Sequence, residues 1–154
     1  MGVGLSQAPT TDAPSLAISL VICTRNRAPQ LERCLKNIQQ MRCSETWELV
    51  IVDNGSTDAT RAVIDGLRDS LPCPVSVSVE PTPGLGRARN VGWRTARGQV
   101  VSFTDDDCYP HPNFLNDVLN AFKPDPRLGF LGGRILLYDP TDYRITIQEH
   151  DQRE

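Results

Sequence analysis

Several features that would assign a sequence to a special class of protein are missing from this chain of 154 residues. No stretch approaches the roughly 20 consecutive apolar residues that a membrane-spanning helix needs, and the start lacks the charged and apolar regions of a signal peptide. The five cysteines include no CxxC pair and are odd in number, which argues against a zinc site and a disulfide framework. We therefore expect a cytoplasmic protein that associates with a membrane only through a partner.

Basic residues are not in excess either. Lysine and arginine number 16 against 19 aspartates and glutamates, and the net charge is -3. This balance argues against a nucleic-acid-binding protein that relies on bulk electrostatic attraction, but it allows a local basic pocket. The remaining composition, with 39% hydrophobic and 23% charged residues, is ordinary for one globular domain and leaves open whether the protein is an oligomer.

Apolar runs alternate with amphipathic stretches along most of the chain. The run LAISLVIC at 16–23 is continuous and β-rich, which is typical of a parallel strand covered on both faces. The run at 74–80 alternates apolar and polar residues, which favours a strand closer to an edge of the sheet. The pattern predicts strands at 16–23, 47–53, 74–80, 99–104 and 128–138, and helices at 28–41, 57–70, 87–97 and 111–123.

This alternation predicts a Rossmann-like α/β domain with a mainly parallel sheet and helices on both faces. We expect a flexible leader at 1–15, the domain at 16–140 and a tail at 141–154. Sheets of this kind bind their ligands beyond the carboxyl ends of the strands. The residues expected there are Thr24, Arg25, Asn26 and Arg27 after the first strand, Asp53, Asn54, Gly55 and Ser56 after the second, Glu80 after the third, and Asp105, Asp106 and Asp107 after the fourth.

The three consecutive aspartates are the most unusual feature of these strand ends. Like charges this close repel one another, and a fold tolerates them where water, a cation or a cationic ligand relieves the repulsion. If the extended conformation persists, Asp105 and Asp107 share one side and Asp106 faces away. A hard divalent cation such as Mn²⁺ or Mg²⁺ takes one or two carboxylates and completes its shell with water and phosphate oxygens. The sequence thus predicts an anionic ligand held together with a metal.

Three segments carry a more specific resemblance. They are VICTRNRAPQLERCLKNI, ELVIVDNGSTDAT and PGLGRARNVGWRTARGQVVSFTDDDCYPHPNFL. Together they resemble the nucleotide-sugar-binding half of a family-2 glycosyltransferase with the GT-A fold, over roughly residues 16 to 140. The resemblance implies transfer of a sugar from a nucleoside-diphosphate sugar, with a mild leaning to a UDP-sugar. It leaves open whether the acceptor is a saccharide, a lipid or a protein.

The resemblance also implies roles for residues at the strand ends. The Asp-x-Asp element would hold Mn²⁺ or Mg²⁺ on the donor diphosphate, with Asp107 as the preferred metal ligand and Asp105 as a further ligand nearer the ribose. Asp53 would hydrogen-bond the base. The positions that border the base, the ribose or the rest of the nucleotide are matched by Thr24, Arg25, Arg87 and Asn90.

The implied reaction is displacement at the anomeric carbon through an oxocarbenium-like transition state, with inversion as the family's usual course. The family's catalytic base and much of its acceptor-binding surface lie well beyond the Asp-x-Asp element, whereas this chain ends at Glu154. We therefore expect the base to be missing from this chain and the domain to be truncated at its carboxyl end. None of the carboxylates near that end sits in a recognisable acidic motif; they are Asp139, Asp142, Glu149 and Asp151.

Other interpretations of the same residues stay open. The chain could be a non-catalytic nucleotide-sugar-binding or assembly module. Asp53 could cap the turn that follows it, and Arg25 and Arg27 could be ordinary surface charges. Among the arginines of 87–97 we favour Arg87, since the others fit a solvated helix face. A phosphotransfer receiver domain also places acids at strand ends, but LGFLGGRILLYDP lacks the lysine that such a domain needs at a later strand end.

Overall fold

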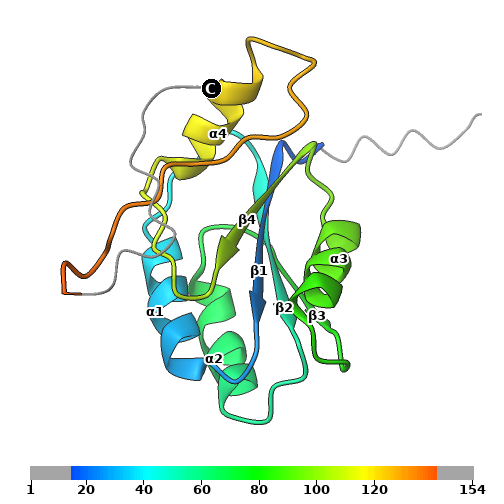
Figure 1. The fold of residues 1–154 in the computed structure, drawn as a ribbon, viewed down its shortest axis with the longest axis vertical. Coiled ribbons are helices and arrows are strands. Elements are labelled where there is room, and N and C mark those ends of the chain that lie inside the picture. The colour runs from blue at the N-terminus through cyan, green and yellow to red at the C-terminus, as the bar shows by residue number, and fades with distance from the viewer. Residues whose placement is uncertain (1–14, 142–154) are drawn as a thin grey trace, which may run out of the picture.

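The computed structural model describes residues 15–141. The predicted leader at 1–15 and the predicted tail at 141–154 therefore lie almost wholly outside the described residues. Strands and helices alternate along the described chain (Figure 1). In chain order they are β1 (Ile18–Thr24), α1 (Ala28–Ile38), β2 (Trp47–Asp53), α2 (Thr60–Leu67), a short 3-10 helix η1 (Arg68–Ser70), β3 (Val75–Val79), α3 (Leu85–Thr95), β4 (Val100–Asp105) and α4 (Phe114–Phe122).

The strands form one parallel sheet in the order β3-β2-β1-β4. β1 pairs with β2 on one side and with β4 on the other, so that Thr24 aligns with Asp53, and Cys23 aligns with Asp105. Because all strands run in one direction, their carboxyl ends meet at one edge, which points downwards in Figure 1. The predicted parallel α/β sheet is confirmed, and so is the position of β3 at an edge of the sheet.

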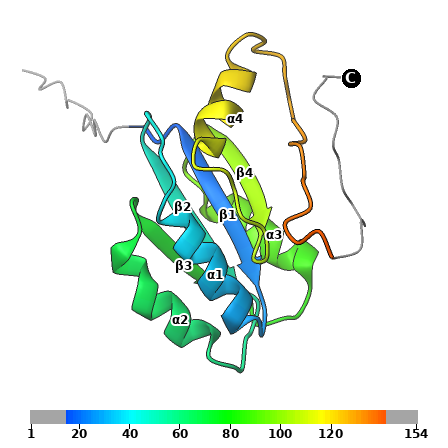
Figure 2. The same ribbon diagram turned by 90° about the vertical axis from the view of Figure 1, so that its left-hand side faces the viewer.

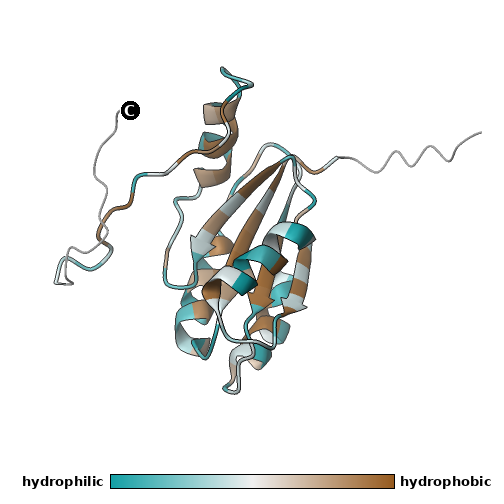
Figure 3. Cartoon of the chain, turned by 45° about the vertical axis from the view of Figure 1, so that its right-hand side comes forward, coloured by the Kyte–Doolittle hydropathy of each residue, from teal (hydrophilic) through white to brown (hydrophobic). Residues whose placement is uncertain are grey.

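Helices cover both faces of the sheet, with α1 and α2 on one face and α3 on the other (Figure 2). α1 has a proline in its first turn, where the missing N–H costs nothing. Its residues Leu31, Cys34, Leu35 and Ile38 are all fully buried, as their i, i+3, i+4 and i+7 spacing predicts. They pack on β1 and β2 and form the larger of two apolar cores. Coloured by hydropathy, the strands show bands of strongly apolar residues (Figure 3).

α3 covers the other face through small residues. Ala88 is fully buried against Val21, Val50 and Val52. Gly92 lies so close to the same face that a Cβ atom there would collide with Val21. The close approach brings the first turn of α3 beside the carboxyl end of β1, where both contribute to one hollow.

The predicted inward face of α2 is partly wrong. Ala59 and Ala62 are exposed, whereas Ile64 is fully buried. The reason is the start of the helix: the Asp58 carboxylate accepts hydrogen bonds from the Thr60 amide (3.0 Å) and hydroxyl (2.6 Å). The helix therefore begins at Thr60, which leaves Ala59 outside it, and the face that carries Thr60 and Ile64 turns towards the core.

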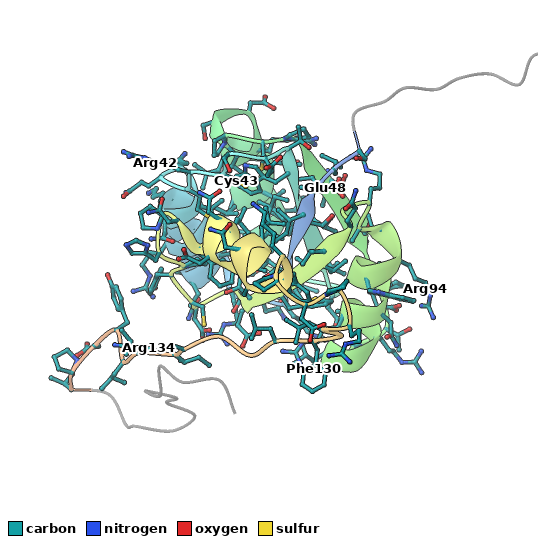
Figure 4. All side chains as sticks on the ribbon, turned by 90° about the horizontal axis from the view of Figure 1, so that it is seen from above. Arg42, Cys43, Glu48, Arg94, Phe130 and Arg134 are labelled. Carbon is teal, nitrogen blue, oxygen red and sulfur yellow. The ribbon has the colours of Figure 1, made fainter. Side chains whose placement is uncertain are left out.

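The strand predicted at 128–138 is also wrong, because these residues form only an isolated bridge at Ile135. No described strand extends the sheet beyond β4, so most of the apolar residues of this segment remain exposed. Phe130, labelled in Figure 4, is 88% exposed. α4, by contrast, buries Leu115 in the larger core. Within residues 15–141, no helix combines the length and the hydropathy needed to cross a membrane.

Candidate active site at the carboxyl edge of the sheet

A hollow of about 400 Å³ opens at the carboxyl edge of the sheet. Its walls are the ends of β1 and β4, the turn after β2 and the start of α3; the lining residues are Cys23, Thr24, Arg25, Arg27, Asn54, Pro83, Gly84, Leu85, Ala88, Asp105, Asp106 and Asp107. A larger hollow of about 580 Å³ lies between the end of α1 and the start of α4, but no carboxylate lines it. We place the candidate site at the carboxyl edge, where sheets of this class bind ligands.

Asp106 is the innermost of the three aspartates, and the prediction that it faces away from the site is wrong. β4 ends at Asp105, and the chain turns at once, with the Cys108 amide 3.2 Å from the Asp105 carbonyl oxygen. The extended conformation that the prediction assumed therefore stops too early. Asp106 turns towards β1, where it is 4% exposed and accepts a hydrogen bond of 2.6 Å from the Thr24 hydroxyl.

Two arginines pair with the three aspartates. Arg27 bridges two of them: its Nε lies 3.2 Å from Asp106 Oδ1, and its Nη2 donates a hydrogen bond of 2.5 Å to Asp107 Oδ2. From the opposite wall, Arg89 Nη2 lies 3.3 Å from Asp105 Oδ1. The repulsion within the acidic run is thus relieved by side chains of the fold itself, and each carboxylate has an arginine partner.

The protonation of Asp106 reflects its burial. Burial raises the pKa of the Asp106 carboxyl above its ordinary value, even though the Thr24 hydrogen bond and the Arg27 charge act in the opposite direction. For Arg27, burial opposes the charged form, but Asp106 and Asp107 outweigh it and raise the pKa of the guanidinium. Arg27 is therefore a permanent cation, while Asp106 carries its charge at a cost.

Asp53 and Asn54 shape the neighbouring turn. Asp53 is buried, and its Oδ1 accepts a hydrogen bond of 2.8 Å from the Ser56 amide, which is the turn-capping role left open by the sequence. Asn54 donates to the carbonyl oxygens of Glu80 and Thr82 and accepts from the Gly84 amide, each at 2.8 Å. The Asn54 side chain therefore fixes the loop from β3 to α3, which forms one wall of the hollow.

The other predicted nucleotide contacts lie at different distances from the hollow. Arg25 is exposed and lines it. Arg87 and Asn90 are exposed on α3 and do not line it, although the Arg87 side chain lies over Gly84, which does. Figure 4 shows Arg94, further along α3, projecting away from the sheet. The arginine of this helix that reaches the aspartates is Arg89, which the sequence did not single out.

Cys23 and Thr24 line the hollow without being free to react. Burial raises the pKa of the Cys23 thiol to about 11, so it is a neutral thiol near pH 7 and a poor nucleophile. Thr24 is 3% exposed, and its hydroxyl proton is committed to Asp106. We assign neither side chain a covalent role.

The carboxylates fit a cation that needs few protein ligands. Within the described residues, no group of three or more His, Cys, Asp or Glu side chains converges on one metal position. The Asp105 and Asp107 side chains nevertheless open to the hollow, at 59% and 47% exposure. Mg²⁺-type ions bind through one or two carboxylates and take their other ligands from water and phosphate. The donor set therefore suits such an ion but not a structural metal.

Sequence reasoning missed three of the residues that organise this site: Arg27, Arg89 and Asp106. A weak signal existed for Arg27, which follows β1 in the same loop as Arg25. For Arg89 and Asp106 the signal is absent, because their importance depends on where α3 starts and where β4 stops. Neither boundary is fixed by hydrophobic periodicity alone.

Known proteins resemble this chain over most of its length. The profile of the Glycosyl transferase family 2 matches residues 19–151. An uncharacterized glycosyltransferase, alr2836 of Nostoc sp., is 33% identical over 116 residues, which cover 75% of this chain and 36% of the relative. The chain thus spans only about a third of that relative's length.

Two solved structures share the fold. One is Staphylococcus aureus TarS 1-349 in complex with UDP, with a TM-score of 0.64 and 28% identity over 70% of this chain and 32% of that one. The other is the mannosyltransferase PcManGT from Pyrobaculum calidifontis in complex with GDP-Man and Mn²⁺, with a TM-score of 0.63 and 28% identity over 71% of this chain and 32% of that one. The mixed α/β fold with a parallel sheet is therefore that of GT-A glycosyltransferases.

Proposed function

The chain belongs to the Glycosyl transferase family 2, and from this premise we propose that it binds a nucleoside-diphosphate sugar with a divalent cation at the carboxyl edge of the sheet. The observation that carries the proposal is the three-aspartate turn after β4, which lines a hollow together with Arg25 and Arg27. We propose that residues 16–140 form the donor-binding unit of a sugar transferase. Relatives with UDP, or with GDP-Man and Mn²⁺, support this class of ligand.

In this proposal the nucleotide lies across the ends of β1, β2 and β4. Asp53 and Arg25 face the base and ribose, and Arg87 and Asn90 approach the nucleotide from α3. Asp107 holds the cation, with Asp105 as a further ligand nearer the ribose. We favour a UDP-sugar as the donor, since a neighbour of the same fold is known with UDP and with UDP-GlcNAc, over a GDP-sugar such as the GDP-Man of the other neighbour.

Mn²⁺ or Mg²⁺, when bound, supplies Lewis-acid neutralisation of the negative charge on the diphosphate leaving group. The residues of this chain have other tasks. Asp106 and Arg27 hold the turn on which Asp105 and Asp107 sit. The hollow orients the donor so that its anomeric carbon is open to an acceptor hydroxyl, with inversion as the proposed outcome. We assign the catalytic base to none of the described carboxylates, because only the three aspartates of the turn line the hollow.

Thermal unfolding with combinations of ligand tests the donor and metal parts of the proposal. We expect UDP to raise the melting temperature only when Mn²⁺ or Mg²⁺ is present. Asp107→Asn should remove the metal-dependent part of the increase, because it weakens a carboxylate ligand without changing its shape. Asp117→Asn is the matched control, since Asp117 is exposed on α4 and does not line the hollow. An equal increase in EDTA would refute the metal role.

Turnover is a separate measurement. Release of UDP from UDP-sugars in the presence of Mn²⁺, with and without candidate acceptors, distinguishes an enzyme from a binding module. Hydrolysis or transfer that depends on Asp107 supports the transferase. Metal-dependent donor binding without turnover by any acceptor would instead identify the chain as a nucleotide-sugar-binding module.

A further inference from the structure

We propose that Arg27 is an exchangeable counter-ion of the site: it competes with the divalent cation for Asp107, and when displaced it pairs with the diphosphate of the donor. The inference rests on the proposed function, since it assigns a role within that site. It concerns a residue for which the sequence favoured a surface charge.

The backbone of Arg27 is fixed while its side chain can move. Asn26, just before it, has a left-handed backbone with φ 51 and is tied to the loop after β2, where its amide donates to the Ser56 hydroxyl (3.0 Å). In return, Asn26 Oδ1 accepts a hydrogen bond of 2.7 Å from the Thr57 amide. Arg27 then precedes the first turn of α1. The backbone of Arg27 therefore stays in place when its guanidinium changes partner.

The guanidinium has an inner contact and an outer contact. On the inner side, Nε is buried and lies 3.2 Å from Asp106 Oδ1, but it makes no hydrogen bond, so the contact is an ion pair without good alignment. On the outer side, Nη2 donates to Asp107 Oδ2 at 2.5 Å. The Arg27 side chain is 42% exposed and lines the hollow, so its outer end can reach a ligand there.

Arg27 and a metal ion cannot share Asp107 at low cost. A divalent cation ligated by the same carboxylate would lie a few ångströms from the guanidinium, where the two positive charges repel each other, more strongly in a partly buried site than in water. One of the two must give way. A displaced guanidinium then has an anion at hand, because the arginine fork matches phosphate oxygens in a bidentate manner.

Arg25 provides the comparison that separates this role from general electrostatics. It carries the same charge, lines the same hollow and lies in the same loop. Within residues 15–141, however, no ion pair joins Arg25 to Asp105, Asp106 or Asp107. Loss of either arginine removes one positive charge from the hollow, but only loss of Arg27 frees Asp107.

The test is a titration of the 154-residue protein with MnCl₂, followed by electron paramagnetic resonance of free Mn²⁺ or by calorimetry, first alone and then with saturating UDP. Without nucleotide, Arg27→Gln should tighten Mn²⁺ binding about fivefold, the factor that corresponds to a partly exposed ion pair. With UDP present, the same variant should bind the Mn²⁺–UDP pair about tenfold more weakly, because a charge-assisted phosphate contact is lost. Tighter Mn²⁺ binding without UDP together with weaker binding with UDP is the result that only an exchange of partners by Arg27 predicts.

Two further variants keep the outcome interpretable. Arg25→Gln should change the Mn²⁺ affinity less than twofold, and Arg27→Lys, which keeps the charge, should stay within about twofold of the wild type without nucleotide. Equal tightening by Arg25→Gln and Arg27→Gln, or no tightening by Arg27→Gln, would overturn the exchange while leaving the proposed function intact. If the wild type binds Mn²⁺ neither alone nor with UDP, and Arg27→Gln does not restore binding, both the exchange and the metal-dependent function are wrong.

Discussion

The two ends of the sheet both join carboxylates to arginines, but they do so in different ways. At the amino edge, Glu48 on β2 meets Arg97, which lies between α3 and β4. At the carboxyl edge, three aspartates meet Arg27 and Arg89. In the first contact, each polar atom that becomes buried has a hydrogen-bond partner. The second leaves exposed charge facing a hollow.

The amino edge is a closed hydrogen-bond network around one acid. Glu48 is fully buried and accepts from the Ser19 hydroxyl (2.8 Å), from the Arg97 amide (2.8 Å) and from Arg97 Nε (3.0 Å) and Nη2 (2.6 Å). Burial alone would raise the pKa of Glu48, but these hydrogen bonds outweigh it and hold the pKa below its ordinary value. Glu48 therefore stabilises the fold in its charged form.

The carboxyl edge shows the opposite balance. Asp106 has one strong hydrogen bond from Thr24, and the ion pair with Arg27 is poorly aligned, so burial dominates and its pKa is raised. A buried carboxylate that stays charged at a cost in stability is expected in a ligand-binding site, because such sites give up some stability for function. Carboxylate and arginine thus stabilise the fold at one edge, and in the proposed function they belong to the binding site at the other.

Close packing against backbone atoms also marks the amino edge, and Gly98→Ala is the change that we expect to damage this edge most. A Cβ atom on Gly98 would lie 2.5 Å from the Ser19 amide nitrogen and 2.6 Å from the Ile18 carbonyl carbon. Backbone atoms of a central strand cannot move aside cheaply, so we expect a loss of about 3 kcal/mol in the free energy of unfolding. Urea denaturation measures it.

Gly86→Ala is the matched change near the carboxyl edge. Gly86 lies in the first turns of α3, and a Cβ there would meet nothing within 4 Å. Because alanine favours the helix over glycine, we expect this variant to gain about 0.5–1 kcal/mol. A loss of similar size in both variants would show that the two edges do not differ in packing.

Removal of the buried acid should have the next largest effect. Glu48→Ala leaves the Ser19 hydroxyl without its acceptor and leaves the Arg97 amide only its longer hydrogen bond to Ser19 Oγ (3.2 Å), which together cost about 2 kcal/mol. The loss stays moderate because the Arg97 side chain is 63% exposed and can return its charge to water. The control is Glu45→Ala, an exposed position near β2, for which we expect a change within about 0.5 kcal/mol. Equal unfolding midpoints for the two variants would contradict a stabilising network.

Most of the fold could be predicted from the sequence, because hydrophobic runs alternate with helical periodicity. The strand at 47–53 was predicted with its observed limits, and the buried face of α1 was predicted residue by residue. The segment 128–138 was not, because an apolar β-rich run forms a strand only when another strand offers hydrogen bonds to it. No described strand does so beyond β4.

The location of the site could also be predicted, but its internal contacts could not. Polar residues at the carboxyl ends of parallel strands converge by topology alone, and Asp105, Asp107, Thr24 and Arg25 do line one hollow. The inward position of Asp106 depends on a turn that begins at the last residue of β4. The alternation of side chains predicts their direction only within a strand, and Asp106 lies just after the end of β4.

The smallest effect is also the one that compares the two acids directly. Glu48→Gln and Asp106→Asn each replace a buried carboxylate by an amide of the same shape, yet we expect opposite signs. At pH 7, Glu48→Gln should lose about 1 kcal/mol of stability, because its charged form is the one that the network holds. Asp106→Asn should lose nothing or gain up to about 1 kcal/mol, because it removes a charge that burial disfavours.

The pH dependence of stability tests whether the charge of each carboxylate causes these opposite changes in stability. Glu48 has a lowered pKa, so its contribution to stability is fully present above its ordinary value, 4.5, and is lost as the pH falls from there through the lower folded value. Asp106 has a raised pKa, so its ionisation reduces stability as the pH rises from its ordinary value, 3.8, through the folded value. Urea midpoints measured between pH 3 and pH 7 should therefore converge with the wild type at low pH for both variants, from below for Glu48→Gln and from level or above for Asp106→Asn. If Asp106→Asn is instead the less stable variant at pH 7, then Thr24 and Arg27 stabilise its charge as completely as Arg97 stabilises that of Glu48, and the contrast between the two edges disappears.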